Sequence, residues 1–327
     1  MHGSVPTCVY IAGSGRNGST LLGLHLGKHH DIFFAGELTH IWRRSYINDE
    51  LCGCGEPFSR CEFWRAVTRT AFGELSHLEL QHIVRLRDQG SSFWRIPSLA
   101  AGLPRRCDKA TAEYSGFYQA LLAAIADVSG ARFIVDSSKY PTDLAMLCET
   151  GAVPLRVIHL VRDCNAVVFS WKRRRHRPEI HWRHQLMPRY SAFTSALGWR
   201  LFNSATERLS RGLGRSYRVL RYEDLVECFP QTLGDIFEWL GPRSVDHVRG
   251  HDLGAHSVSG NPCRFATGTD EIRRDDEWRT RMSISDRMIV ALVCGGPQRS
   301  YGYGKNSSVP VPENVCAQPF VTQYTPR

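Results

Sequence analysis

Five short apolar runs, rich in β-branched and aromatic residues, alternate along the chain with stretches whose apolar positions recur at helical spacing. The runs cover residues 8–13, 32–36, 132–136, 155–161 and 217–222. The helical spacing predicts helices over 18–28, 62–88, 109–128, 140–149, 163–175, 189–211 and 229–240. Strands that alternate with helices predict an α/β fold, a parallel sheet flanked by helices with ligands at the carboxyl ends of the strands.

No linker divides this pattern, so we expect a single domain over residues 1–303. Residues 40–110 fall between two predicted strands and are expected to form a helical insertion or acceptor-side region. Residues 304–327 contain four prolines and no periodicity, which predicts an extended C-terminal tail.

The composition is that of a globular protein, with 42% hydrophobic and 22% charged residues. No apolar run is long enough to cross a membrane, and residues 1–7 lack the features of a secretory signal. We therefore expect a soluble cytoplasmic protein. The net charge of +9 favours anionic partners, without saying whether they are nucleic acid, membrane or a small phosphorylated ligand.

Most of the 11 cysteines are scattered, which is typical of thiols in a reducing compartment. Cys52, Cys54 and Cys61 are the exception, because they cluster in the segment LCGCGEPFSRC. Zinc sites need about four ligands, and only His40 lies close upstream. We therefore expect no metal, and a glycine-rich loop with or without a local disulfide is the simpler interpretation.

Residues 13–20 spell G-x-x-x-x-G-x-T where the first predicted strand gives way to a helix. Such a loop turns its backbone N–H groups and the helix N-terminus toward an anion. Ser19 stands where a nucleoside-triphosphate loop carries lysine, which argues against an ATPase or a kinase. The cation is Arg16, inside the loop itself. A turn without a ligand is the alternative.

Arg162 follows the fourth predicted strand, and Ser170 lies eight residues further on, two turns along the next predicted helix. The two side chains can converge on a second anion. A salt bridge of Arg162 is the simpler alternative. The basic run over residues 172–177 suggests nucleic acid, but no nucleic-acid-binding module surrounds it, and a solvated helix face or helix end explains it better.

Two further residues follow strands at the same predicted edge of the sheet. Glu37 can take a proton from an acceptor hydroxyl, although an ion pair with Arg43 or Arg44 would also explain it. Lys139, in FIVDSSKYP, can stabilise negative charge on a departing oxygen. Asp136 in the same segment leaves open a magnesium-binding acid of a nucleotide hydrolase.

The chain resembles the sulfotransferases that use 3'-phosphoadenosine 5'-phosphosulfate (PAPS), in their bacterial and carbohydrate-type branch. GSGRNGSTLLG resembles their 5'-phosphosulfate loop, and the Arg-Asp before a serine two turns later resembles their 3'-phosphate motif. The segments RYEDL and GNPCRFATG are similar to later family segments. The resemblance spans about residues 8–280, and residues 40–110 and 176–200 match nothing that identifies the acceptor.

The resemblance implies a P-loop-like fold, PAPS as co-substrate and no metal. Its catalytic residues would be Glu37 as general base, with Lys139 and Arg16 holding the sulfonate and bridging oxygen. The other implied donor contacts are Gly15, Asn17, Gly18, Ser19, Thr20 and Leu21 in the loop, together with Arg162, Ser170, Tyr222 near the adenine, and Arg264.

The expected reaction is transfer of a sulfuryl group from PAPS to a hydroxyl, less favourably an amine, of a small-molecule or glycan acceptor. Nucleic acid is not an expected partner, and the pattern leaves the oligomeric state open. The alternatives are a kinase or nucleotide hydrolase with a degenerate loop, and a polyanion-binding protein that uses the basic run.

Overall fold

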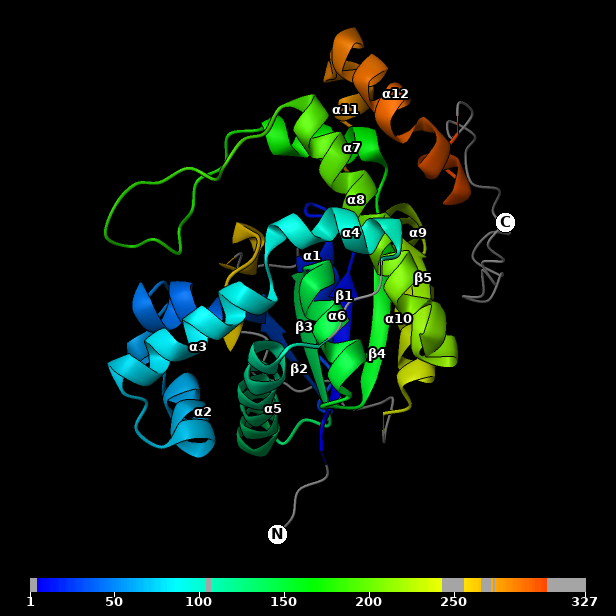
Figure 1. Cartoon of the computed structure of the whole chain (residues 1–327). Helices are drawn as coiled ribbons and strands as arrows, with labels where there is room; N and C mark the ends of the chain where they lie inside the picture. The colour runs from blue at the N-terminus through cyan, green and yellow to red at the C-terminus, as the bar shows by residue number, and fades with distance from the viewer. Residues whose placement is uncertain (1–4, 104–106, 243–255, 266–271, 273, 305–327) are drawn as a thin grey trace.

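The structure is a computed structural model that describes residues 5–103, 107–242, 256–265, 272 and 274–304. Its centre is one parallel sheet with the strand order β2-β3-β1-β4-β5 (Figure 1). The strands are β1 (Thr7–Ala12), β2 (Ile32–Gly36), β3 (Phe133–Lys139), β4 (Leu155–Val161) and β5 (Tyr217–Arg221). The predicted α/β class is confirmed, and each strand coincides with one of the five apolar runs to within three residues at either end.

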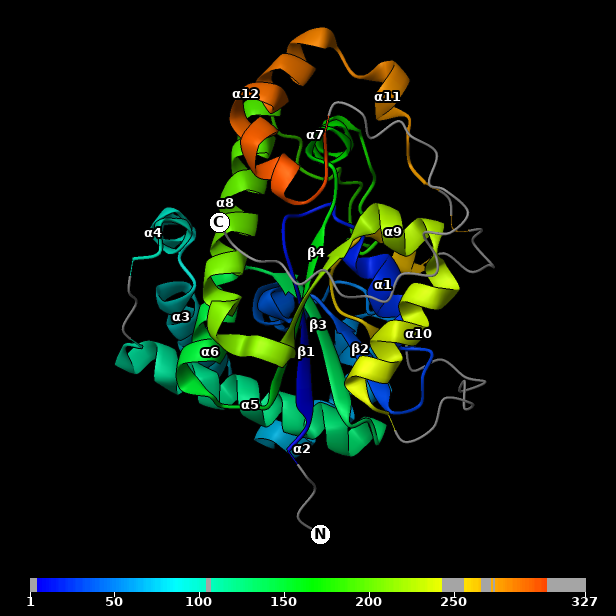
Figure 2. The ribbon, with the colours of Figure 1, turned by 90° about the vertical axis from the view of Figure 1, so that its right-hand side faces the viewer.

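Helices cover both faces of the sheet, as Figure 2 shows. Cys8 and Tyr10 of β1 pack into a core with α5 (Lys109–Ser129) and α6 (Pro141–Thr150). Val9 and Ile11 point the other way, into a core with α1 (Ser19–Leu26) and α10 (Phe229–Leu240). Both sets are fully buried because successive side chains of a strand alternate between its faces.

The helix predicted over 62–88 is two helices, α2 (Glu62–Phe72) and α3 (His77–Gly90). Gly73 ends the first with a positive φ of 68°, and Ser76 caps the second by accepting from the backbone of Glu79. Gly73 and the Ser76 cap therefore divide a segment whose apolar pattern is continuous. The helix predicted over 163–175 is α7 (Cys164–Lys172), and the one predicted over 189–211 is α8 (Ala192–Ser210).

Several elements had not been predicted, above all α12 (Ile284–Ser300), which packs against α8 and α7. The others are α4 (Ile96–Ala101), α9 (Tyr222–Glu227), α11 (Trp278–Arg281) and the short turns η1 (Leu38–His40), η2 (Ile41–Ile47), η3 (Phe58–Arg60), η4 (Phe93–Arg95), η5 (Arg211–Ser216) and η7 (Pro262–Phe265). The predicted tail lies outside the described residues after Gly304. Among the described helices, none is both long and apolar enough to cross a bilayer.

The strand order decides where a ligand can bind. β1 lies between β3 and β4, so the turn that follows β1 is next to the turns that follow β3 and β4. The connection from β1 leads to β2, on one side of β1, and the connection from β3 leads to β4, on the other side of β1. Open α/β sheets bind ligands at such a reversal, outside the carboxyl ends of the strands.

Candidate functional site

The turn between β1 and α1, residues 13–18, is held in shape by Asn17. The Asn17 side chain is fully buried, donates to the carbonyl oxygen of Leu160 at 2.8 Å and accepts from the backbone N–H of Ser19 at 3.2 Å. Gly18 adopts a φ of +96°, and a Cβ there would clash with the ring of Tyr222. The first helical hydrogen bond runs from Leu22 to Gly18, so the N–H groups of Thr20 and Leu21 have no partner within the helix and are available to an anion.

Arg16 lies inside this loop at a φ of +67°, with its guanidinium 4.7 Å from the centre of the Trp171 ring. One terminal nitrogen lies 3.0 Å from the sulfur of Met187, and the buried Nε has no hydrogen-bond partner. Burial first, and then the charge of Arg175, lower the Arg16 pKa to about 10. The side chain is therefore a charged donor with unused hydrogen-bonding capacity, as an anion site requires.

Arg162, at the end of β4, lies beside the loop. Its Nη1 donates to the carbonyl oxygen of Arg16 at 3.2 Å, and its guanidinium is 4.4 Å from the centre of the Tyr222 ring. Tyr222 thus contacts both Arg162 and Gly18. Arg162 also pairs with Asp275 at 3.4 Å, and its buried Nε has no partner. The two predicted anion sites open onto one region of the protein and not onto separate surfaces.

Ser170 is buried on α7, the helix that begins two residues after Arg162. The adjacent Trp171 packs on the loop, since a Cβ on Gly15 would meet its ring at 2.7 Å. The helix is capped by Asp163, whose side chain accepts from the N–H of Asn165 at 2.8 Å. This cap fixes the direction in which α7 leaves the sheet and brings its last turn back to the loop.

Glu37, Lys139 and Ser19 meet at the ends of β2, β3 and the loop. The Nζ of Lys139 lies 2.7 Å from Oε1 of Glu37 and 3.2 Å from the hydroxyl of Ser19, and it also donates to the carbonyl of Ser137. Lys139 reaches these partners from a left-handed backbone conformation with a φ of +70°. The ion pair predicted for Glu37 exists, but its partner is Lys139 and not Arg43 or Arg44.

The surroundings of Glu37 strongly favour its charged form. Burial raises its pKa, but the charge of Lys139 above all outweighs burial and lowers the value to about 2. His40 lies 3.6 Å from Oε2 of Glu37, and burial together with Arg44 holds the His40 pKa well below its usual range. Glu37 is therefore a carboxylate at every physiological pH, and His40 is neutral.

Asp136 serves the interior of the fold. Its carboxylate accepts from the hydroxyl of Tyr118 at 2.6 Å, from the N–H of Ser138 at 2.8 Å and from the N–H of Leu38 at 3.3 Å. Burial above all raises its pKa to about 6. Both oxygens are engaged by protein donors, which argues against the magnesium-binding acid of a nucleotide hydrolase.

Arg264 takes part in a different set of contacts from those predicted. It donates to the carbonyl oxygens of Ser257 and Leu51, at 2.5 and 2.8 Å. No contact with Arg162 or Ser170 is seen among the described residues. The structure thus brings Arg162, Tyr222 and the loop together, and it holds Arg264 in a neighbouring segment.

The basic run over residues 172–177 lies at a helix end, one of the two predicted interpretations, because α7 ends at Lys172. Lys172 pairs with Asp286 at 2.6 Å, and Arg173 pairs with Asp275 at 3.1 Å. Arg177 is buried, with Glu50 at 3.0 Å and Glu179 at 2.7 Å. Acidic residues, most of them from distant parts of the chain, therefore neutralise half of the run, which weakens the polyanion-binding alternative.

The cysteines of the described residues comprise a cluster of three, the disulfide-bonded Cys228 and free thiols elsewhere in the fold. Cys52, Cys54 and Cys61 lie together with His256, which the sequence analysis missed because it is about 200 residues away and belongs to no motif. No disulfide joins these three cysteines. Cys228 is disulfide-bonded, so the prediction of a thiol is wrong for that residue.

Comparisons with known proteins find sulfotransferases among the relatives of the chain. No family model matches the chain. Carbohydrate sulfotransferase 2 of Mus musculus and that of Homo sapiens are each 23% identical to it over 94% of this chain. Carbohydrate sulfotransferase 3 of Homo sapiens is 26% identical over 49% of this chain and 36% of its own length. The chain spans 66% of the length of the first two relatives, just under two thirds.

Among solved structures, the sulfotransferase domain from the Synechococcus PCC 7002 olefin synthase is 18% identical, with a TM-score of 0.44 over 93% of this chain and 97% of that domain. The sulfotransferase domain from the curacin biosynthetic pathway is 17% identical, with a TM-score of 0.46 over 89% of this chain and 98% of that domain. The relatives that match nearly the whole chain confirm the resemblance of the sequence motifs. The chain is thus similar to sulfotransferases over nearly its whole length.

Proposed function

We propose that the chain is a sulfotransferase that takes a sulfuryl group from PAPS and transfers it to a hydroxyl of a carbohydrate or another small acceptor. The observation that carries the proposal is the position of Tyr222, which contacts both Gly18 of the loop and Arg162. PAPS bears a phosphate at each end of its adenosine, so its binding site needs two neighbouring anion-binding sites, each with a cationic side chain.

The side chains around the loop fit such a donor. The hydroxyl of Ser14 and the Nε atoms of Arg16 and Arg162 are buried without hydrogen-bond partners, a costly state that an anionic ligand would relieve. We assign the phosphosulfate to the loop and to the first turn of α1, and the 3'-phosphate to Arg162 and Ser170, with Tyr222 beside the adenine. Arg264 already donates to two carbonyls, and we do not retain it as a donor contact.

The residues at the strand ends supply the chemistry of transfer. When bound, PAPS supplies the sulfuryl group and leaves as adenosine 3',5'-bisphosphate. Glu37 accepts the proton of the acceptor hydroxyl, while Lys139 and Arg16 stabilise the negative charge that accumulates on the oxygen that leaves.

The ion pair with Lys139 controls when Glu37 can act as a base. With a pKa of about 2, Glu37 binds a proton too weakly to assist a hydroxyl efficiently. An anion in the loop attracts the Nζ of Lys139, which lies 3.2 Å from Ser19. Weakening the Lys139 contact raises the Glu37 pKa, so the base becomes effective when a donor is present.

A thermal-shift comparison tests the donor. Ligands that bind the native state raise its melting temperature according to their affinity. We expect adenosine 3',5'-bisphosphate to stabilise the chain, and ATP with magnesium or a short oligonucleotide to do so much less. Stabilisation by ATP that requires magnesium, or by the oligonucleotide alone, would contradict the proposal.

The acceptor is tested by incubating the chain with PAPS and a panel of glycans and small alcohols, followed by mass spectrometry of the products. The names of the relatives make carbohydrates the first class to try. We expect a hydroxyl acceptor to gain a sulfonate and an amine acceptor to react less. A chain that binds the bisphosphate but modifies no acceptor in a broad panel would count against transfer.

A further inference from the structure

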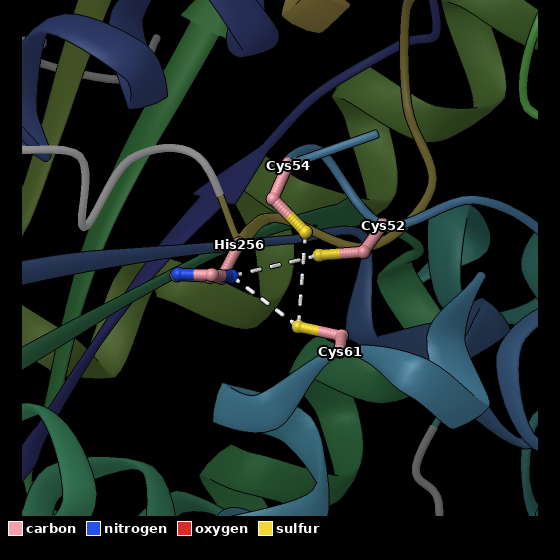
Figure 3. Close-up of side chains that lie close together, drawn as sticks. All are labelled: Cys52, Cys54, Cys61 and His256. Atoms are coloured by element: carbon pink, nitrogen blue, oxygen red, sulfur yellow. Dashed lines mark hydrogen bonds between the residues drawn. The ribbon is translucent and has the colours of Figure 1, made fainter. Parts of the chain in front are cut away.

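Four metal-binding side chains converge outside the proposed donor site. The sulfurs of Cys52, Cys54 and Cys61 and the Nδ1 of His256 all lie within 4.8 Å of one another, and they point toward a common centre (Figure 3). The three cysteines come from the loop before α2, and His256 comes from the segment that leads to Val258. We propose that these four residues bind a structural zinc ion.

The distances match the edges of a zinc tetrahedron. Zn–S bonds of about 2.3 Å and Zn–N bonds of about 2.0 Å place two sulfur ligands about 3.8 Å apart, and a sulfur and a nitrogen ligand about 3.5 Å apart. The sulfurs of Cys54 and Cys61 are 3.8 Å apart. Nδ1 of His256 lies 3.3 Å from the sulfur of Cys61 and 3.9 Å from that of Cys52. A disulfide would need two sulfurs at about 2.05 Å.

Backbone hydrogen bonds hold both ligand-bearing segments in place without the ion. The N–H of Cys52 donates to the carbonyl of Glu56, and the N–H of Gly55 donates back to the carbonyl of Cys52, each at 2.9 Å. The carbonyl of His256 accepts from the indole of Trp64 at 2.7 Å. Preformed ligands of this kind favour a tightly bound, structural metal over a transient one.

The chemistry of the four ligands favours zinc over other metals. Three thiolates and one imidazole form a closed set of soft and borderline ligands, typical of structural zinc and unsuited to magnesium or calcium. Three thiolates leave a charge of about −1 around a divalent ion. A buried cation stands next to the site, because Arg264 donates to the carbonyls of Leu51 and Ser257, the residues beside Cys52 and His256.

The zinc would join the cysteine loop to a segment that reaches the catalytic region. Val258, two residues after His256, pairs in parallel with Gly36, and its carbonyl accepts from the N–H of Glu37 at 2.8 Å. Asn261 donates to the hydroxyl of Thr20 at 3.3 Å. The metal therefore fixes the segment over residues 256–261 against the end of β2 and the start of α1.

The first test measures metal in the full-length chain, produced with zinc in the medium and purified in reducing, chelator-free buffer. Elemental analysis should find about one zinc per chain. The zinc content should fall at least fivefold in Cys54→Ser and in His256→Asn. It should stay unchanged in Cys107→Ser, because Cys107 is an exposed cysteine outside the cluster. Less than a tenth of an equivalent in the wild type, another bound metal, or unchanged zinc in both variants would overturn the proposal.

The second test needs no variant and so is independent of misfolding. Mass spectrometry follows alkylation of each cysteine in the wild-type chain with and without a zinc chelator. The chelator should speed alkylation of Cys52, Cys54 and Cys61 at least tenfold and leave Cys107 unchanged. Alkylation rates of the three cysteines that the chelator does not change, or a disulfide between two of them in freshly purified protein, would overturn the proposal. Neither test depends on sulfotransferase activity.

Discussion

Two clusters of polar side chains lie near the end of β2, and they differ in the charges of their members. Glu37 and Lys139 carry opposite charges and satisfy each other in the absence of any ligand. Cys52, Cys54, Cys61 and His256 all offer lone pairs to the same point. The first cluster can exchange partners when an anion enters, whereas the second needs a cation to hold its ligands together.

The two clusters also differ in how the fold brings their residues together. The Glu37 cluster consists of residues that directly follow strands, so the parallel sheet brings them together. The cysteine cluster joins two connecting segments, with His256 more than 190 residues from the cysteines. Perturbing the first should mainly affect catalysis, and perturbing the second should mainly affect the integrity of the segments beside it.

The largest expected effect is that of Glu37→Gln on turnover. Removing the base should lower kcat by about 10²- to 10⁴-fold, while the affinity for adenosine 3',5'-bisphosphate changes little. Steady-state kinetics and calorimetry measure the two quantities. His40→Gln is the control, because His40 lies beside Glu37 in the structure, and it should lower kcat by less than about tenfold. A similar small loss in both variants would remove Glu37 from the catalytic role.

The second effect is the pH dependence of stability. The pKa of Glu37 is about 2 in the folded chain and about 4.3 when unfolded, so its carboxylate stabilises the fold fully above about pH 5, and this stabilisation is lost as the pH falls toward 2. The contribution is about 3 kcal/mol in the free energy of unfolding. Denaturant unfolding of wild type and Glu37→Gln from pH 2 to 6 checks it. Parallel curves would mean that the ion pair is not formed in solution.

The third effect concerns donor affinity. Arg162→Ala should weaken binding of adenosine 3',5'-bisphosphate by about 10- to 100-fold, because a charge-assisted hydrogen bond is lost at one end of the ligand. Arg173→Ala is a matched control, since Arg173 pairs with the same Asp275 but belongs to the basic run. Isothermal calorimetry should show a change below about threefold for this control. Equal losses would point to Asp275, or to general charge, as the cause.

The smallest effect is that of the cysteine cluster on catalysis. Cys54→Ser should lower kcat by about tenfold or less, because the segment over residues 256–261 shifts against Glu37. Donor affinity should fall less than kcat, by about twofold, since the segment contacts Thr20 of the proposed donor site but neither Arg162 nor Tyr222 in the described part of the chain. Kinetics and calorimetry on the same preparation separate the two quantities. A large loss of donor affinity with intact kcat would mean that the two clusters are not separate units.

The sequence alone determined the five strands, most of the helices and the positions of the residues that follow each strand. Apolar periodicity reports burial locally, and parallel strands place their carboxyl ends at one edge. The loop over residues 13–18, Glu37, Lys139 and Arg162 were identifiable for that reason. The break between α2 and α3 was missed because the apolar pattern continues across it.

Only the tertiary structure decided which residues contact one another. It paired Glu37 with Lys139, gave Arg264 two carbonyl partners and brought His256 to the cysteines. Such contacts form between segments far apart in the chain, and each depends on how connecting loops pack and not on any local pattern. Spacing along the chain therefore predicted the loop over residues 13–18 but gave no sign of His256, the fourth ligand of the proposed zinc site.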